Sequence, residues 1–158
     1  MTLHEDFVIK SSPIHGNGLF AKRGFDAGVI LFRFEGQNLS GDDAKIFSPK
    51  QKDNFVQIGK DLFLNTEGMH SAFINHSCRP NAYIKVLVNA AFIQSIIPIR
   101  AGDEITIHYS LSAPNGKELL ECNCGISFGC HELVGSFEDL DEKAKVGLRK
   151  FLPEWRKK

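Results

Sequence analysis

The chain has 158 residues, 42% of them hydrophobic, which is enough to build one domain with a buried core. Its 19 basic residues balance 19 acidic ones, so no overall charge would draw the chain to nucleic acid or to an anionic membrane. The chain has 13 phenylalanines and 2 tyrosines. This apolar content excludes a disordered polar chain, and the excess of phenylalanine over tyrosine predicts aromatic packing without water inside the fold.

The N-terminal residues, Met1 to Asp6, lack the basic start and the apolar run of a secretory signal. The best apolar stretch, Ala90 to Ile99, is shorter than the ~20 residues that span a bilayer, and polar residues and a proline interrupt it. We therefore expect an intracellular protein, cytoplasmic or nuclear, with no membrane partner. In that environment the cysteines are expected to be reduced thiols or metal ligands.

Short β-type runs recur before residue 110, and glycine- and proline-containing turns separate them. The runs are residues 7–9, 18–21, 29–34, 55–58, 62–64, 83–88, 91–97 and 104–109. Residues 42–53 predict a short helix that is interrupted at Pro49. The pattern as a whole predicts a mainly β domain of small sheets with few helices.

The pattern changes after Asp139, where apolar residues recur at spacings of three and four. These residues are Leu140, Ala144, Leu148, Phe151 and Leu152. We expect an amphipathic C-terminal helix with an N-cap at Asp139 or Asp141 that ends before Pro153. Trp155 and the basic residues 156–158 are expected to form a packed or frayed end of the chain, solvated rather than a targeting signal.

The cysteines of the chain fit one metal site, because Cys122, Cys124 and Cys130 lie close together and Cys78 is the remaining one. Four thiolates suit a tetrahedral Zn²⁺ with no open coordination position, which is a structural site. Such a site would hold residues 121–135, which have too little apolar area to fold alone. Two alternatives stay open, namely four unrelated cysteines and a redox pair within the Cys-x-Cys motif.

Three further stretches carry polar residues that need partners. Residues 12–20 contain a Gly-x-Gly motif, which alone indicates no more than a turn. Residues 73–81 read Phe-Ile-Asn-His-Ser-Cys-Arg-Pro-Asn, which suits a capped turn, yet the cysteine would tie this turn to the C-terminal cysteines. Residues 102–109 are a turn followed by an alternating strand that ends in a tyrosine.

In this order, the four features resemble the SET-domain family of S-adenosylmethionine-dependent protein-lysine methyltransferases, and the resemblance runs nearly end to end. Residues 12–28 resemble the family's first strands with their Gly-x-Gly cofactor loop, and residues 73–81 match its Asn-His-Ser-Cys-x-Pro-Asn signature. Residues 101–109 resemble its Gly-Glu-Glu-Leu-Thr strand with a terminal tyrosine, and residues 122–130 resemble its post-SET zinc motif.

The resemblance implies the SET-domain fold, which is mainly β, with several small sheets, short helices and a threaded pseudoknot. In the pseudoknot, residues 75–81 cross the strand that ends at Tyr109, so that both segments line one site. Residues 1–112 would form the SET domain, and residues 113–158 would add the post-SET zinc segment and a C-terminal helix to the same structural unit.

The resemblance also implies roles for individual residues. Tyr109 would be the catalytic residue that orients the methyl group and the amine. Contacts to S-adenosylmethionine would come from His15, Gly16, Asn17, Gly18, Asn75, His76, Tyr109 and Asn123. Ile107 and Phe55 would line the channel for the substrate lysine. One structural Zn²⁺ would be held by Cys78, Cys122, Cys124 and Cys130.

Four departures from the family pattern bear on activity. The tyrosine that many members place in the strand before the signature falls here near Asn54 or Phe55, on one wall of the lysine channel. Ile107 stands where many members have an aromatic residue, and Ala72 stands where an arginine is common. Five residues, rather than four, separate Cys124 from Cys130, so this loop is expected to bulge. Because Ile107 is smaller than an aromatic residue, di- or trimethylation of the lysine is expected to be sterically allowed.

We therefore expect a protein-lysine N-methyltransferase that acts on a lysine of a histone or another basic protein. Two alternatives are a SET-like module that binds cofactor or a protein partner without turnover, and a zinc-stabilised adaptor with no cofactor site. No nucleic-acid partner is expected, since the basic residues are dispersed and form no recognisable module.

Overall fold

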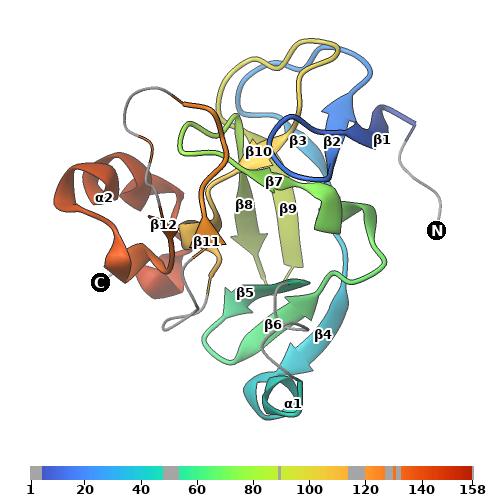
Figure 1. The fold of residues 1–158 in the computed structure, drawn as a ribbon. Coiled ribbons are helices and arrows are strands. Elements are labelled where there is room, and N and C mark those ends of the chain that lie inside the picture. The colour runs from blue at the N-terminus through green and yellow to red at the C-terminus, as the bar shows by residue number, and fades with distance from the viewer. Residues whose placement is uncertain are drawn as a thin grey trace.

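The framework of the protein consists of several small β-sheets rather than one large sheet (Figure 1). The structure is a computed structural model that describes residues 5–47, 54–88, 90–113, 120–126, 130 and 133–157. Within these residues there are three sheets of two strands and two sheets of three strands. The helices are short, so the predicted mainly β fold is confirmed.

The strands predicted before residue 100 are present, with shifts of one or two residues at their ends. They are β1 (Phe7–Ser11), β2 (Asn17–Ala21), β3 (Ile30–Phe34), β5 (Phe55–Gly59), β6 (Leu62–Asn65), β8 (Ala82–Leu87) and β9 (Ala90–Ser95). The sequence pattern misses β4 (Gln37–Ser40), because Leu39 is its one buried residue and no alternation marks it.

All strand pairs in the two larger sheets are antiparallel, with the orders β3-β9-β8 and β4-β6-β5. The β1–β2 hairpin packs its buried side chains into the main core together with the β3-β9-β8 sheet. At the centre of this core, the ring of Phe7 stacks on Phe25 and contacts Phe32 edge to face. The expected dry aromatic packing is present here, and the sheets form a rigid support for the loops between them.

Two short strands that lie far apart in the sequence pair in parallel, as Figure 1 shows: β7 (Asn75–His76) and β10 (Thr106–Ile107). The Asn81 side chain strengthens the crossing, because its nitrogen donates to the Glu104 carbonyl at 2.7 Å and its oxygen accepts from the Thr106 N–H at 2.9 Å. The two predicted segments are therefore held side by side.

The single strand predicted over residues 104–109 is wrong in extent. Glu104 and Ile105 bond to β2 instead, through a bridge to Phe20 and a hydrogen bond to the Leu19 carbonyl. The chain then pairs with β7 over two residues only and turns into a 3-10 helix, η3 (Tyr109–Leu111). An apolar–polar alternation cannot reveal this change of partner, because the alternation continues through both segments.

The predicted C-terminal helix is present as α2 (Glu142–Leu148), which continues directly into a 3-10 turn, η5 (Arg149–Phe151), and ends before Pro153 as expected. Two further 3-10 turns flank it, η4 (Phe137–Asp139) and η6 (Glu154–Arg156). Asp141 is the N-cap of α2, since its carboxylate accepts from the Ala144 N–H at 2.9 Å. Asp139, the other predicted start, instead forms a capping box with Ser136 at η4. It therefore belongs to a separate turn that precedes the helix.

The helix predicted over residues 42–53 is observed as α1 (Gly41–Lys45), with a capping box between Ser40 and Asp43. Residues 48–53 lie outside the described part of the chain. None of the helices that the structure describes has the length and hydropathy of a membrane-spanning helix.

A second, smaller core joins the C-terminal helices to the rest of the chain. Its buried members are Leu111, Phe137, Leu140 and Leu152, and Tyr83 packs against it from β8. In the chain between Leu111 and Phe137, β11 (Leu120–Glu121) and β12 (Leu133–Val134) form an antiparallel pair. The expected division between residues 112 and 113 stays a prediction, because this core contains residues from both sides of it.

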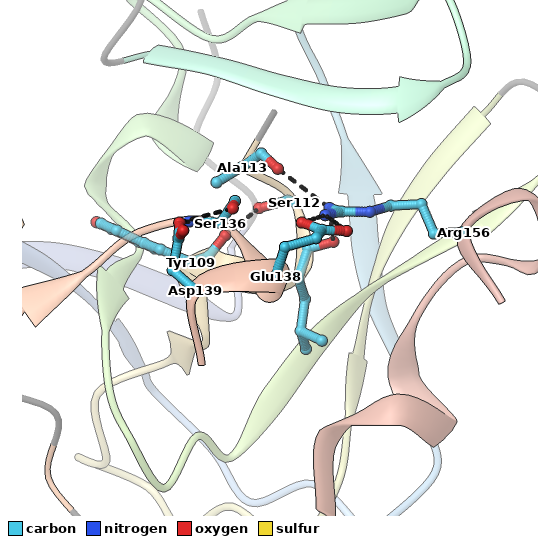
Figure 2. A network of polar contacts seen from close by, with 8 residues as sticks. Tyr109, Ser112, Ala113, Ser136, Glu138, Asp139 and Arg156 are labelled. Atoms are coloured by element: carbon cyan, nitrogen blue, oxygen red, sulfur yellow. Dashed lines mark hydrogen bonds and ion pairs between the residues drawn. The ribbon is translucent and has the colours of Figure 1, made fainter. Parts of the chain in front are cut away.

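Of the two expected alternatives for the basic end of the chain, Arg156 follows the packed one, since its side chain is 6% exposed, whereas Lys157 is exposed. Its guanidinium donates to the carbonyl oxygens of Leu111 at 3.3 Å and Ala113 at 3.1 Å, and it pairs with Glu138 at 3.0 Å (Figure 2). These carbonyls end the helix that begins at Tyr109 and need donors. Arg156 therefore fastens the segment after Tyr109 to the C-terminal helices.

Candidate active site and zinc centre

A cavity of about 610 Å³ lies between the turn after β1, the β7 strand and the C-terminal segment. This volume is within the usual range for sites that bind small molecules. Its lining includes His15, Gly16, Asn17, Asn75, His76, Tyr109 and Asn123, together with Ile14, Asn54, Ala72, Phe73, Leu120, Glu121, Cys122 and Val134. All predicted cofactor-binding residues except Gly18 are thus brought to one cavity.

Gly18 lies behind the cavity rather than on its wall. A Cβ atom at this position would collide with the carboxylate of Glu104, so only glycine lets β2 pass this close. The glycine of the Gly-x-Gly motif that does line the cavity is Gly16, whose φ of 49° is in the left-handed region. The two glycines therefore serve different purposes, close packing and a sharp turn.

A buried polar network holds the Gly-x-Gly loop in place. The Asn75 side-chain nitrogen donates to the carbonyl oxygens of His15 at 3.1 Å and Asn17 at 3.2 Å, and to the Glu104 carboxylate at 2.7 Å. The Ser12 hydroxyl donates to the same carboxylate at 2.9 Å. Sequence reasoning assigns no role to Ser12 or Glu104, because their connection appears only when β2 and the segment before β10 meet.

Tyr109 lines the cavity from the first position of η3, two residues after the end of β10. Its hydroxyl donates to the carbonyl oxygen of Ile74 at 3.0 Å, and its backbone N–H donates to Nδ1 of His76 at 3.2 Å. Burial, together with the negative charge of Glu104, raises the pKa of Tyr109 to about 12. The hydroxyl is therefore protonated throughout the physiological pH range and can act as a hydrogen-bond donor.

A second, narrower cavity of about 60 Å³ has Tyr109 on its wall as well. The predicted channel residues Phe55 and Ile107 both line it, with Phe34, Val56, Ile74 and others. Asn54, Ala72 and Tyr109 line both cavities. The position at which the family pattern places a tyrosine, near Asn54 or Phe55, is thus on the wall of the narrow cavity, and Asn54 reaches the wide one as well.

The four cysteine sulfurs gather beside the larger cavity, all within 4.8 Å of one another. Their closest Sγ–Sγ distances run from 3.5 Å, between Cys122 and Cys130, to 3.9 Å, between Cys78 and Cys130. Zn–S bonds of about 2.3 Å in a tetrahedral site place the sulfurs about 3.8 Å apart. The donor set therefore fits one Zn²⁺, and the alternative of four unrelated cysteines is excluded.

The local electrostatics already favour a thiolate at this cluster. Burial raises the pKa of Cys124, but backbone hydrogen bonds at Cys78 and Ile126 outweigh it and bring this pKa to about 7. Burial raises the pKa of Cys122 to about 11, and a bound cation would offset this cost. The expected bulge between Cys124 and Cys130 falls mainly on residues 127–129, outside the described residues.

Comparisons with known proteins agree with this geometry. The model of the SET domain matches residues 16–110, so the chain belongs to the SET-domain family. Over 135 residues it is 30% identical to histone-lysine N-methyltransferase 2B of Homo sapiens, which covers 78% of this chain and 5% of that protein. Over 134 residues it is 28% identical to histone-lysine N-methyltransferase trithorax of Drosophila virilis, which covers 77% of this chain and 3% of that protein.

A solved structure supports the fold. A chain in a humanized mutant of the Chaetomium thermophilum Polycomb Repressive Complex 2, bound to an inhibitor, superimposes with a TM-score of 0.62. The two chains are 22% identical, and the match covers 69% of this chain and 15% of that one. The predicted membership and SET-type fold are therefore confirmed, while the chain spans only a small part of the relatives that it matches.

Proposed function

We propose that this protein is a protein-lysine N-methyltransferase that uses S-adenosylmethionine as methyl donor. The observation that carries the proposal is that Tyr109 lines both a wide and a narrow cavity. The wide cavity has the volume and the polar lining for a nucleoside-sized donor, and the narrow one suits a single unbranched side chain. The names of the relatives, histone-lysine N-methyltransferases, point to the same reaction.

S-adenosylmethionine, when bound in the wide cavity, supplies a methyl group on a positively charged sulfur. The residues of the chain have two tasks in the transfer. Phe55 and Ile107 surround the lysine with apolar groups, which disfavours an ammonium ion and favours the neutral amine that can attack. Tyr109 contacts both cavities and orients the amine, and such alignment supplies much of the rate enhancement.

The substrate proposed is a lysine in a histone or another basic protein, because the relatives act on histone lysines by name. One structural Zn²⁺ is proposed at the four cysteines, where it would hold the wall formed by Cys122 and Asn123 against the wide cavity. The cofactor contacts proposed for His15, Gly16, Asn17, Asn75 and Asn123 rest on their place in that wall.

Mass spectrometry of reaction products tests the proposal. The zinc-loaded protein is incubated with methyl-deuterated S-adenosylmethionine and with pools of lysine-containing peptides and histones. Deuterated methyl groups on lysine are expected in at least one pool, and Tyr109→Phe is expected to form them at least about 100-fold more slowly. If no pool carries label although S-adenosylhomocysteine binds, the chain is a SET-like binding module instead.

The rate of methyl transfer is expected to rise with pH between about pH 8 and pH 10, because a larger fraction of substrate lysine is neutral. The pKa of about 12 keeps the Tyr109 hydroxyl protonated over this range, so its ionisation adds no falling limb to the profile. Single-turnover rates in a series of buffers measure this. A falling limb below pH 10 that disappears in Tyr109→Phe would contradict the expectation.

Ile107→Phe is expected to shift the product toward monomethyl-lysine. The Ile107 side chain is buried on the wall of the narrow cavity, and a larger ring would fill the space beside the amine. Mass spectrometry of the product at long reaction times compares the wild type, Ile107→Phe and Ile107→Ala. Strict monomethylation by the wild type that Ile107→Ala leaves unchanged would show that this residue does not set the product.

A further inference from the structure

We propose that His76 is a positioning residue that connects the zinc centre to the backbone of Tyr109. The proposal rests on the proposed function in so far as Tyr109 is catalytic. The observation behind it is that the two ring nitrogens of His76 point to two different parts of the site. Nδ1 accepts from the Tyr109 N–H at 3.2 Å, and Nε2 lies 3.4 Å from Sγ of Cys78.

The hydrogen bond from Tyr109 determines which ring nitrogen of His76 carries the proton. A backbone N–H can only donate, so Nδ1 of His76 must accept and must be unprotonated. In a neutral imidazole the proton is then on Nε2, which faces the sulfur of Cys78. His76 therefore donates a hydrogen bond to the Cys78 thiolate.

The same tautomer decides between two candidate metal groups. His76, Cys78 and His108 also lie close enough together to share an ion. A protonated Nε2 has no lone pair for a metal, and Nδ1 is occupied by the Tyr109 N–H, so His76 is not a ligand. The cysteine cluster is therefore the metal group, and His76 belongs to the shell of residues around it.

The surroundings of His76 hold its ring in one orientation. The ring is 7% exposed, and His108 packs against it edge to face with ring centroids 4.7 Å apart. β7 fixes its backbone by pairing with β10, the strand that leads into Tyr109. Because the ring is held in place, a displacement of Cys78 would also move the acceptor of the Tyr109 N–H. This N–H is the first of the η3 helix and has no partner within the helix, so it depends on His76.

Two substitutions separate the two contacts of His76. In His76→Asn, the amide oxygen occupies the place of Nδ1, so the acceptor for Tyr109 is kept and the donor to Cys78 is lost. In His76→Gln, the longer side chain keeps a donor within reach of Cys78 and loses the acceptor for Tyr109. Replacing a residue that hydrogen-bonds a metal ligand commonly costs about 10- to 100-fold in metal affinity.

The first readout is zinc affinity, measured by competition with a chelator. We expect His76→Asn to weaken zinc binding by about 10- to 100-fold and His76→Gln to stay close to the wild type. His70→Gln is the matched control, because His70 is also a buried histidine, 6% exposed, and packs against Phe32 in the main core. Equal zinc affinities in His76→Asn and the wild type would overturn the link to Cys78.

The second readout is the Tyr109 amide, and the composition makes it simple to observe. The chain has 2 tyrosines, so protein labelled with ¹⁵N-tyrosine gives two amide signals, which Tyr83→Phe assigns. At saturating zinc, we expect the Tyr109 signal to shift in His76→Gln and to stay near its wild-type position in His76→Asn. ¹⁵N-histidine spectra should show Nε2 of His76 protonated; a protonated Nδ1 would overturn the proposal.

Neither readout requires methyl transfer. The connection from the zinc centre through His76 to Tyr109 can therefore be tested even if the proposed function is wrong. If transfer is observed, His76→Gln is expected to lower kcat by a larger factor than it raises the KM for S-adenosylmethionine, since the contact that is lost is the one to the Tyr109 N–H. A higher KM for S-adenosylmethionine with an unchanged kcat would place His76 in cofactor binding and overturn the positioning role.

Discussion

Replacing Tyr109 by phenylalanine is expected to lower the rate of methyl transfer by about 100- to 1,000-fold, the range for removing one preorganised hydrogen-bond donor. The variant keeps the ring on the wall of both cavities and removes the hydroxyl that bonds to the Ile74 carbonyl. The lost hydrogen bond is expected to cost only ~1 kcal/mol in the free energy of unfolding. Single-turnover kinetics and thermal unfolding measure the two effects separately.

Tyr83→Phe is the matched control, because Tyr83 is the other tyrosine and its hydroxyl donates to Gln94 at 2.7 Å, outside both cavities. We expect its transfer rate and its affinity for S-adenosylhomocysteine to match the wild type. A Tyr109→Phe variant that transfers methyl groups as fast as Tyr83→Phe would remove the Tyr109 hydroxyl from the mechanism.

Cys78→Ser is expected to weaken zinc binding by more than about 100-fold. Replacing a residue that only hydrogen-bonds a metal ligand costs up to about 100-fold in metal affinity, and Cys78 is itself a proposed ligand. The loss should spread to the cofactor site, since Cys122 and Asn123 line the wide cavity and are held there by the same cluster. We expect the affinity for S-adenosylhomocysteine to fall by at least about tenfold, or ~1.4 kcal/mol in binding free energy.

Zinc removal from the wild type by a chelator provides the reversible version of this experiment. The affinity for S-adenosylhomocysteine should fall in parallel with zinc loss and return when zinc is added back. Far-ultraviolet circular dichroism reports whether the β framework survives, as its main core lies apart from the cysteines. Unchanged cofactor affinity in the zinc-free, folded protein would contradict the role of the C-terminal segment in the cavity.

The resemblance to the SET-domain family names the candidate site residues, and the structure brings all of them except Gly18 to the two cavities or the cysteine cluster. Asn75, His76 and Cys78 stand together in one signature, and each has its partners within the site. The four cysteines carry their own evidence, since thiols in one group have few functions other than metal binding. The local pattern of apolar residues likewise places most strands to within two residues.

The remaining features depend on contacts between distant segments, which local patterns do not contain. Glu104, which is distant in the sequence, anchors the Gly-x-Gly loop, and its carboxylate leaves no room for a side chain at position 18. The basic composition of the last residues predicts a solvated side chain at Arg156. The structure buries it, because its guanidinium donates to the backbone carbonyls of Leu111 and Ala113. Of the two predicted starts of the C-terminal helix, Asp141 is the N-cap, because Asp139 is used in a capping box with Ser136 in a separate turn.

Calorimetric titration of the zinc-loaded protein with S-adenosylhomocysteine tests the central claim most directly, because it requires no knowledge of the substrate. Saturable one-to-one binding is expected, and it should weaken when the cavity wall is altered at Asn17 or Asn123. Absence of binding, in a protein shown to be folded and to contain zinc, would contradict the assignment of the wide cavity to S-adenosylmethionine and leave a zinc-stabilised adaptor.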